Sequence, residues 1–143
     1  MAPSGNFVQV NVTITKNDDG TYSWAFDSDY NGFDQQTGKV TLQDGGITKI
    51  RYSLLGDGYE LIYVNMDPDV CATREIHNVS IDLLTNSITI TDANSAGPTG
   101  KQPISLRLIA RLTGSTSDPI VSPDPEVQND PSDTVPGRKH HKH

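Results

Sequence analysis

Hydrophobic and polar residues alternate with a period of two along most of the chain. In residues 7–15 (FVQVNVTIT), every second residue is a valine or an isoleucine, and most of the residues between them are polar. This is the pattern of a half-buried β-strand. Residues 21–26 (TYSWAF) alternate in the same way after the turn NDDG, so we expect these two segments to pair as a hairpin.

Six further segments share this period and are separated by turn residues. They are residues 39–42, 47–55, 59–66, 74–84, 87–93 and 104–112. A change of phase near Asn78 predicts a β-bulge. Short strands at regular spacing with Gly- and Pro-rich turns, and no convincing helix, predict an all-β protein. We expect an antiparallel, immunoglobulin-like β-sandwich of about eight strands.

The composition changes after the last of these segments. Between residues 115 and 143 the only apolar side chains are Ile120, Val121, Val127 and Val135. The sequence therefore predicts a β-sandwich domain at 1–114, an extended Asp/Pro-rich arm at 115–132, and a disordered basic and His-rich tail at 133–143. The tail histidines would bind a transition metal with modest affinity, and the sequence leaves open whether this end is native.

Charge and cysteine usage limit the partners and the compartment. The net charge is −7 and the pI is about 4.8, so a nucleic acid or an anionic membrane would be repelled. There is one cysteine, Cys71, which excludes an internal disulfide. Residues 1–12 have neither the basic nor the apolar region of a signal peptide, and no apolar run reaches transmembrane length. We therefore expect a cytoplasmic protein.

The segment DSDYNG, from Asp27 to Gly32, matches the opening of a calcium-binding loop. Calcium would be held by oxygens of Asp27, Asp29, Asn31 and Asp34. The twelfth position of the pattern is Gly38, where such loops carry a bidentate glutamate. The alternative is an Asx-rich loop that stabilises its own bends, and in that case no cofactor is expected.

Candidate catalytic groups are few. Asp67 and Asp69 form a carboxylate pair, and Cys71 with His77 would form a nucleophile dyad if the fold brought them together. A turn and a small buried cysteine explain the same residues without chemistry. Arg107 and Arg111 share one strand face, where they would bind an anion or pair with carboxylates. Because no catalytic motif is present, we expect a protein that is not an enzyme.

The arm has a regular arrangement of its own. Asp118, Asp124 and Asp130 each precede a proline at a spacing of six residues. Proline fixes φ, offers no N–H and keeps the preceding residue extended, so this segment should lie as an extended strap on the domain or on a partner subunit. The expected contacts are Asp118, Pro119, Ile120, Val121, Asp124, Pro125, Val127 and Asn129.

The arm also carries a family resemblance. The segment SDPIVSPDPEVQNDP, after the strand ISLRLIARL, resembles the C-terminal signature of the DP-EP family of small bacterial proteins. Its specific part is centred on residues 124–127 and Asn129, and this chain has Asp130-Pro131 where the family has Glu-Pro. The resemblance implies a β-sandwich and no assigned activity.

Two functions are compatible with these features. The first is a non-enzymatic binding or assembly module that self-associates or docks a protein partner through its arm. The second is calcium-dependent binding of a ligand, such as a carbohydrate, through residues 27–34, with Tyr22, Trp24 or Tyr30 as a stacking surface.

Overall fold

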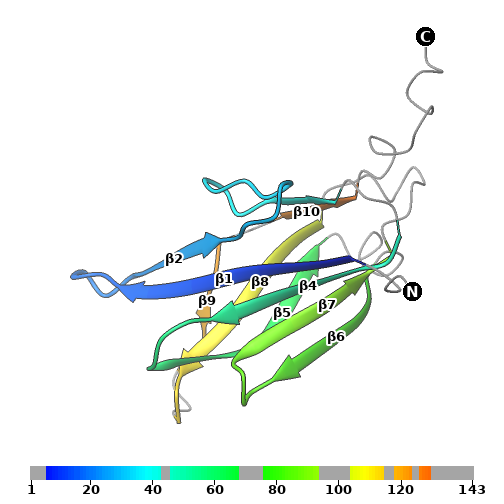
Figure 1. The fold of residues 1–143 in the computed structure, drawn as a ribbon. Helices are drawn as coiled ribbons and strands as arrows, with labels where there is room; N and C mark the ends of the chain where they lie inside the picture. The colour runs from blue at the N-terminus through cyan, green and yellow to red at the C-terminus, as the bar shows by residue number, and fades with distance from the viewer. Residues whose placement is uncertain are drawn as a thin grey trace, which may run out of the picture.

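The computed structural model describes residues 6–42, 46–67, 76–93, 104–114, 118–123 and 126–129. Within these residues the chain forms strands and no helix (Figure 1). The strands are β1 (Asn6–Lys16), β2 (Tyr22–Asp27), β3 (Val40–Leu42), β4 (Thr48–Leu54), β5 (Tyr59–Asp67), β6 (Ile76–Asp82), β7 (Ser87–Asp92), β8 (Ile104–Leu112), β9 (Ile120–Val121) and β10 (Glu126–Asn129). The described part of the chain has no helix that is long and apolar enough to cross a membrane.

The first sheet has the strand order β2-β1-β4-β7-β6. The expected hairpin of β1 and β2 is confirmed, with Val12 opposite Phe26. On its other side β1 runs parallel to β4 over residues 6–12. The bulge expected near Asn78 is also confirmed, because the register of β6 against β7 shifts between Ile76 and Asn78.

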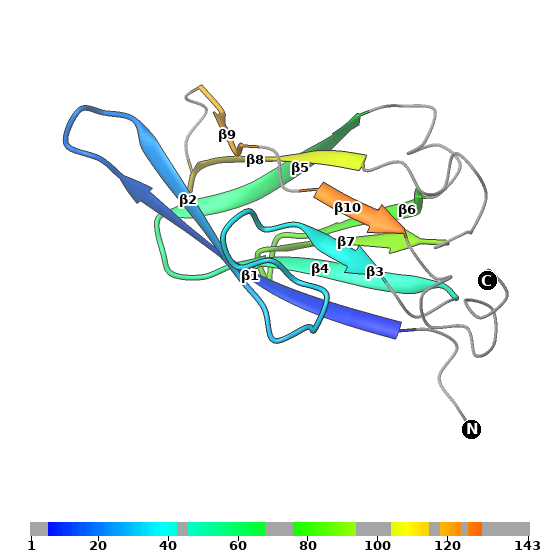
Figure 2. The same ribbon diagram turned by 90° about the horizontal axis from the view of Figure 1, so that it is seen from above.

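The second sheet has the order β3-β10-β8-β5, and β9 also pairs with β8. β8 is antiparallel to β5, β9 and β10, whereas β10 is parallel to β3. Strand β5 carries a second register shift, between Leu61 and Tyr63. Seen from above, β5 and β8 lie on one side of the molecule and β1 and β4 on the other (Figure 2).

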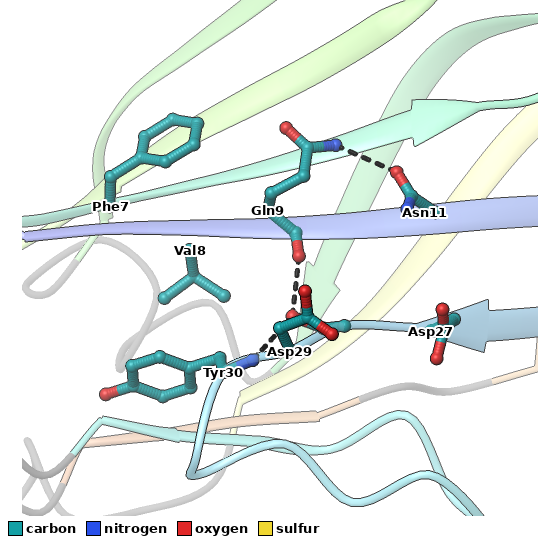
Figure 3. A pocket seen from close by; sticks show the side chains of 8 residues that line it. Phe7, Val8, Gln9, Asn11, Asp27, Asp29 and Tyr30 are labelled. Carbon is teal, nitrogen blue, oxygen red and sulfur yellow. Dashed lines mark hydrogen bonds between the residues drawn. The ribbon is translucent and has the colours of Figure 1, made fainter.

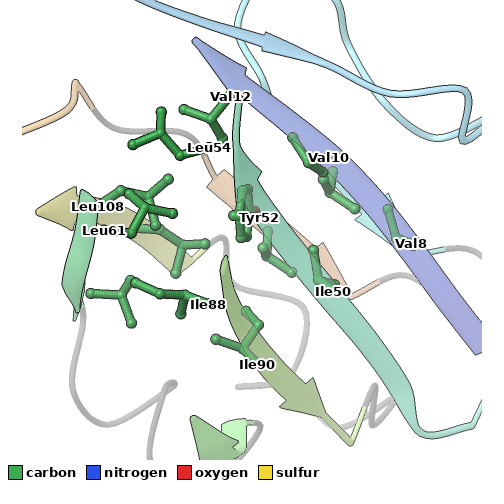
Figure 4. Close-up of a cluster of buried hydrophobic side chains, with 14 of the residues drawn as sticks. Val8, Val10, Val12, Ile50, Tyr52, Leu54, Leu61, Ile88, Ile90 and Leu108 are labelled. Carbon is green, nitrogen blue, oxygen red and sulfur yellow. The ribbon is translucent and has the colours of Figure 1, made fainter. Parts of the chain in front are cut away.

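The core lies between the inner faces of the two sheets. Side chains from β1, β4 and β7 meet Leu61 of β5 and Leu108 of β8 there (Figure 4). The largest of its fully buried side chains are Tyr52, Leu42, Ile50, Leu61, Ile88, Ile90, Ile104, Leu106 and Leu108. The period-two pattern therefore assigns each strand one inward face, as expected for two packed sheets.

Some sequence expectations are wrong in detail. The sheets are mixed rather than purely antiparallel, because β1 with β4 and β3 with β10 are parallel pairs. The described residues form ten strands, against the expected eight or so, because the arm contributes β9 and β10. The strand expected over residues 74–84 ends earlier, at Asp82, because the chain turns there and leaves Leu83 and Leu84 exposed.

The turn between β6 and β7 joins the two sheets. Asn86 adopts a left-handed backbone conformation with φ of 52°. Its side-chain Oδ1 accepts the Leu61 N–H at 2.8 Å, and its Nδ2 donates to the Tyr59 carbonyl at 2.9 Å. Its own carbonyl accepts the Leu54 N–H at 2.9 Å. One asparagine thus satisfies main-chain groups of both sheets at this end of the sandwich.

Candidate functional site

The described part of the arm runs back along the edge of β8. Ile120 lies opposite Ala110, Val121 lies opposite Ile109, and Val127 lies opposite Ile104 further along. The arm therefore covers both ends of one long strand with two short ones. This arrangement makes β9 and β10 part of the second sheet.

Ser122 holds the arm where regular pairing stops. Its N–H donates to the Leu108 carbonyl at 2.9 Å, and its hydroxyl oxygen accepts the Leu108 N–H at 2.8 Å. The hydroxyl also donates to the Pro123 carbonyl at 2.8 Å. The side chain is 2% exposed. A serine hydroxyl can both donate and accept, so one residue completes the pairing as the chain bends into Pro123.

Strand β10 lies between β3 and β8. Val127 faces inward and is fully buried beside Val40 and Ile104, its register neighbours on the two sides. On the outer side, Glu126 lies 3.7 Å from the Lys39 ammonium, with both side chains about one-third exposed. Such an exposed ion pair contributes little, so burial of Val127 and the main-chain hydrogen bonds must dominate the docking.

The residues predicted as arm contacts differ in how far they are buried. Ile120 is buried, whereas its neighbours Asp118, Pro119 and Val121 are exposed. Asp118–Val121 also line a hollow of about 440 Å³ with Tyr22 and Leu112. Asp124 and Pro125 lie outside the described residues, as does the tail at 133–143. For Asn129 the structure describes the main chain, at the end of β10.

The loop that follows β2 is stabilised by its own polar groups. The buried Ser28 donates its hydroxyl to the Gln9 carbonyl at 2.5 Å. Asp34 Oδ1 accepts the N–H groups of Gln36 and Thr37 at 2.8 and 3.3 Å. At Gly32 a Cβ would come within 2.1 Å of the Thr41 carbonyl oxygen, so the close approach of the loop to β3 requires a glycine.

The four predicted calcium ligands are not equivalent in this loop. Asp27 and Asp29 are exposed and line one groove, Asn31 is exposed in the turn, and Asp34 caps the following turn with one of its carboxylate oxygens. Within the described residues, no group of three or more His, Cys, Asp or Glu side chains is arranged to hold a metal ion. Calcium binding here stays a prediction.

The groove beside this loop has a volume of about 350 Å³. Figure 3 shows Phe7 and Gln9 on one face of β1, and Val8 and the Tyr30 ring on the other. Gln9 is fixed by hydrogen bonds: its Nε2 donates to Ser53 Oγ at 2.8 Å, and its Oε1 accepts from Arg51 Nε at 2.7 Å. The Arg51 guanidinium in turn lies 5.0 Å from the centre of the Phe7 ring.

Two of the three aromatic residues suggested as a stacking surface serve another purpose. Trp24 is stacked on Phe26, with ring centres 6.4 Å apart, and Tyr22 meets Tyr59 edge to face at 6.0 Å. Both lie on the inner side of β2 and pack against the core. The alternation of β2 turns them inward, which leaves Tyr30 as the aromatic residue of the loop that lines the groove.

The candidate catalytic residues are only partly described. Asp69 and Cys71 lie outside the described residues, and for Asp67 and His77 the structure describes the main chain at the end of β5 and in β6. The carboxylate pair and the nucleophile dyad stay predictions. Arg111 forms an ion pair with Glu60 on the neighbouring strand, with Nε and Oε2 2.5 Å apart. Arg111 thus pairs with a carboxylate, which is one of the two roles expected for the arginines of this strand.

Sequence reasoning missed Phe7, Gln9 and Asn11 as groove residues. They occupy the polar positions of β1, where Gln and Asn look like ordinary solvent-facing residues. The available signal was Phe7, a large aromatic residue on the face that is otherwise polar, and it is 52% exposed.

Comparison with models of protein families, and with curated proteins, finds no match to this chain.

Proposed function

We propose that the protein is a non-enzymatic assembly module in which strands β9 and β10 of the arm complete the second sheet of its own subunit or of a second copy. The observation that carries this proposal is the position of β10 between β3 and β8. A strand in the interior of a sheet leaves two unpaired edges when it withdraws. Unpaired edges bind another strand readily, and the nearest matching strand is the same arm of another molecule.

The connection between β9 and β10 favours exchange. Pro123 follows Ser122 directly, and a proline cannot donate to a ladder. The two arm strands are therefore separate short contacts, and each can detach without the other. Because an exchanged arm would make the same contacts with another subunit, exchange costs little beyond the entropy of association.

An immunoglobulin-like arrangement is part of the same proposal. Its support is the path of the chain, which crosses between the two sheets after β2, β3, β4, β5 and β7. Such crossings let a short chain bury one face of each sheet against the other. Because an exchanged β10 would take the same interior position in the second sheet of another subunit, assembly then leaves the core unchanged.

The test is a cysteine pair across the junction of arm and sheet. Ile109 and Val121 are register neighbours, and Val121 is 49% exposed. Leu108 and Ser122, the next pair along the ladder, are joined by hydrogen bonds, so Ile109 and Val121 form a non-hydrogen-bonded pair. The side chains of such a pair lie closer together, which suits a disulfide. The variant Ile109→Cys/Val121→Cys, in a Cys71→Ser background, is equilibrated over a range of concentrations and then oxidised.

Exchange predicts disulfide-linked dimers on non-reducing gels. The dimer fraction should rise with the protein concentration at which the variant was equilibrated, and the average mass measured by light scattering should rise with it. Each single cysteine variant is the control for random cross-linking and should stay largely monomeric. Cross-links formed only within one chain, together with a monomeric mass at every concentration, would refute assembly through the arm.

A further inference from the structure

Strand β1 extends beyond its partner β2. The pairing with β2 covers residues 11–16, whereas the pairing with β4 on the other side covers residues 6–12. In the described part of the chain, residues 7–10 therefore have a ladder partner on one side only. After Asp27 the chain leaves the sheet through the loop that leads to β3.

The direction of the free main-chain groups follows from alternation along the strand. The Asn6 N–H donates to the Ile47 carbonyl, and the Val12 carbonyl accepts the Leu55 N–H, so even-numbered residues of β1 face β4. The odd-numbered residues face the opposite way, and the Gln9 carbonyl accordingly accepts the Ser28 hydroxyl. Both main-chain groups of Phe7, and the N–H of Gln9, thus face the side from which β2 has departed.

This open edge coincides with the 350 Å³ groove. Phe7 stands on one face of β1 at the groove, and Val8 and Tyr30 stand on the other (Figure 3). Alternate side chains of an added strand would point to these two faces in turn. The exposed carboxylates of Asp27 and Asp29 lie where β2 ends, and neither forms an ion pair with another described residue.

We propose that this groove binds an extended peptide segment carrying lysine or arginine, which pairs with the free edge of β1 at residues 7–9. Main-chain hydrogen bonds would provide affinity, as in other cases of strand addition. Asp27 and Asp29 would select the basic side chain, because a cation beside two exposed carboxylates is favoured and an anion is repelled.

The same charges argue against a second copy as the occupant. The chain carries a net charge of −7, and pairing two copies edge to edge would bring two Asp27–Asp29 pairs together. Like charges opposed across an interface disfavour the wrong partner. The site is also separate from the arm, which pairs with β3 and β8 of the other sheet, so it does not depend on the assembly proposed above.

The experiment uses the full chain and two dye-labelled synthetic peptides, TKVKVT and TEVEVT, followed by fluorescence anisotropy. One pair of variants isolates the main chain: Phe7→Pro removes the N–H that faces the groove, and Phe7→Ala keeps it. A second pair isolates charge: Asp27→Asn/Asp29→Asn is compared with Asp18→Asn/Asp57→Asn, which removes two exposed carboxylates elsewhere. Thermal unfolding confirms that each variant is folded.

We expect TKVKVT to bind and TEVEVT not to bind. Asp27→Asn/Asp29→Asn should weaken binding about fivefold or more, and its control less than about twofold. Phe7→Pro should weaken binding much more than Phe7→Ala. In hydrogen exchange followed by NMR, bound TKVKVT should slow exchange of the Phe7 and Gln9 amides and leave that of Val10 unchanged, because Val10 already faces β4.

Three results would overturn the proposal. The first is no anisotropy change with TKVKVT up to about 1 mM. The second is equal binding of the two peptides, or equal loss from Phe7→Pro and Phe7→Ala. The third is a dimer of the wild-type chain that Phe7→Pro converts to a monomer, which would make a second copy the occupant of this edge.

Discussion

Ser122 and Leu108 are joined by two hydrogen bonds, and one of them uses a side chain where a regular ladder uses a carbonyl. The Ser122 N–H donates to the Leu108 carbonyl, and the Leu108 N–H donates to the Ser122 hydroxyl oxygen. Both residues are almost completely buried. The serine therefore keeps the arm attached to β8 at the point where proline ends regular pairing.

Ser122→Ala should lower the free energy of unfolding by about 1–3 kcal/mol, because the buried Leu108 N–H loses its acceptor. Urea unfolding measures this change. Ser80→Ala is the matched control on β6, where the serine is exposed, and it should change stability by less than about 0.5 kcal/mol. Equal effects of the two substitutions would mean that the Ser122 bond contributes nothing.

A second prediction compares two valines of the arm. Val127 is fully buried, and Val121 is 49% exposed. Val127→Ala should cost about 2 kcal/mol through lost burial and a residual cavity, whereas Val121→Ala should cost less than about 0.5 kcal/mol. Thermal and urea unfolding distinguish them. An arm that does not dock would leave both variants as stable as the wild type.

Asn86 provides a third prediction. Asn86→Gly keeps the left-handed backbone available but leaves the Leu61 N–H and the Tyr59 carbonyl without the amide, so it should cost about 1–3 kcal/mol. Asn86→Ala should cost about 1 kcal/mol more, because a Cβ disfavours positive φ. The urea midpoint should fall from the wild type to Asn86→Gly and again to Asn86→Ala. An Asn86→Gly variant as stable as the wild type would contradict a stabilising role for the two hydrogen bonds of the Asn86 amide.

Tyr52 makes stability depend on alkaline pH. Burial raises the pKa of its hydroxyl strongly, and the nearby charge of Asp92 raises this pKa further. Above the ordinary tyrosine pKa of about 10, the unfolded chain releases a proton that the folded chain retains. Stability is therefore unaffected below about pH 10 and falls as pH rises, by up to about 1.4 kcal/mol per pH unit.

Tyr52→Phe should remove the contribution of Tyr52 to the fall of the unfolding free energy with pH. Urea unfolding between about pH 9 and 11 measures this fall. Tyr63→Phe, on the exposed side of β5, is the control and should keep the wild-type slope. If both variants lose stability with pH as the wild type does, titration of Tyr52 does not limit folding at high pH.

The sequence predicted the strands whose periodicity is long. β1 and β8 alternate over nine residues or more, so their inward faces could be assigned before the structure. β9 and β10 were missed because strands of two and four residues, each flanked by prolines, do not establish a period. Their sequence signal was Ile120 and Val127, the two apolar arm residues that the structure buries.

Long-range pairing could not be predicted from local pattern. Nothing in residues 6–12 indicates that they run parallel to β4, since parallel pairing depends on how distant segments meet. The groove was found only in part for the same reason. The segment DSDYNG indicated Asp27, Asp29 and Tyr30. Phe7 lines the same groove because the pairing of β1 with β2 stops at Asn11, and this register cannot be read from the local pattern.

The most direct test of the central claim, that the arm is an interior strand of the second sheet, is amide hydrogen exchange at Val127 and Gln128. The claim predicts that both amides exchange slowly, at a rate close to that of Leu106 in β8, because β10 is paired with β3 and β8. Exchange at the rate of an unstructured peptide, while Leu106 stays protected, would show that the domain folds without the arm and would contradict the claim.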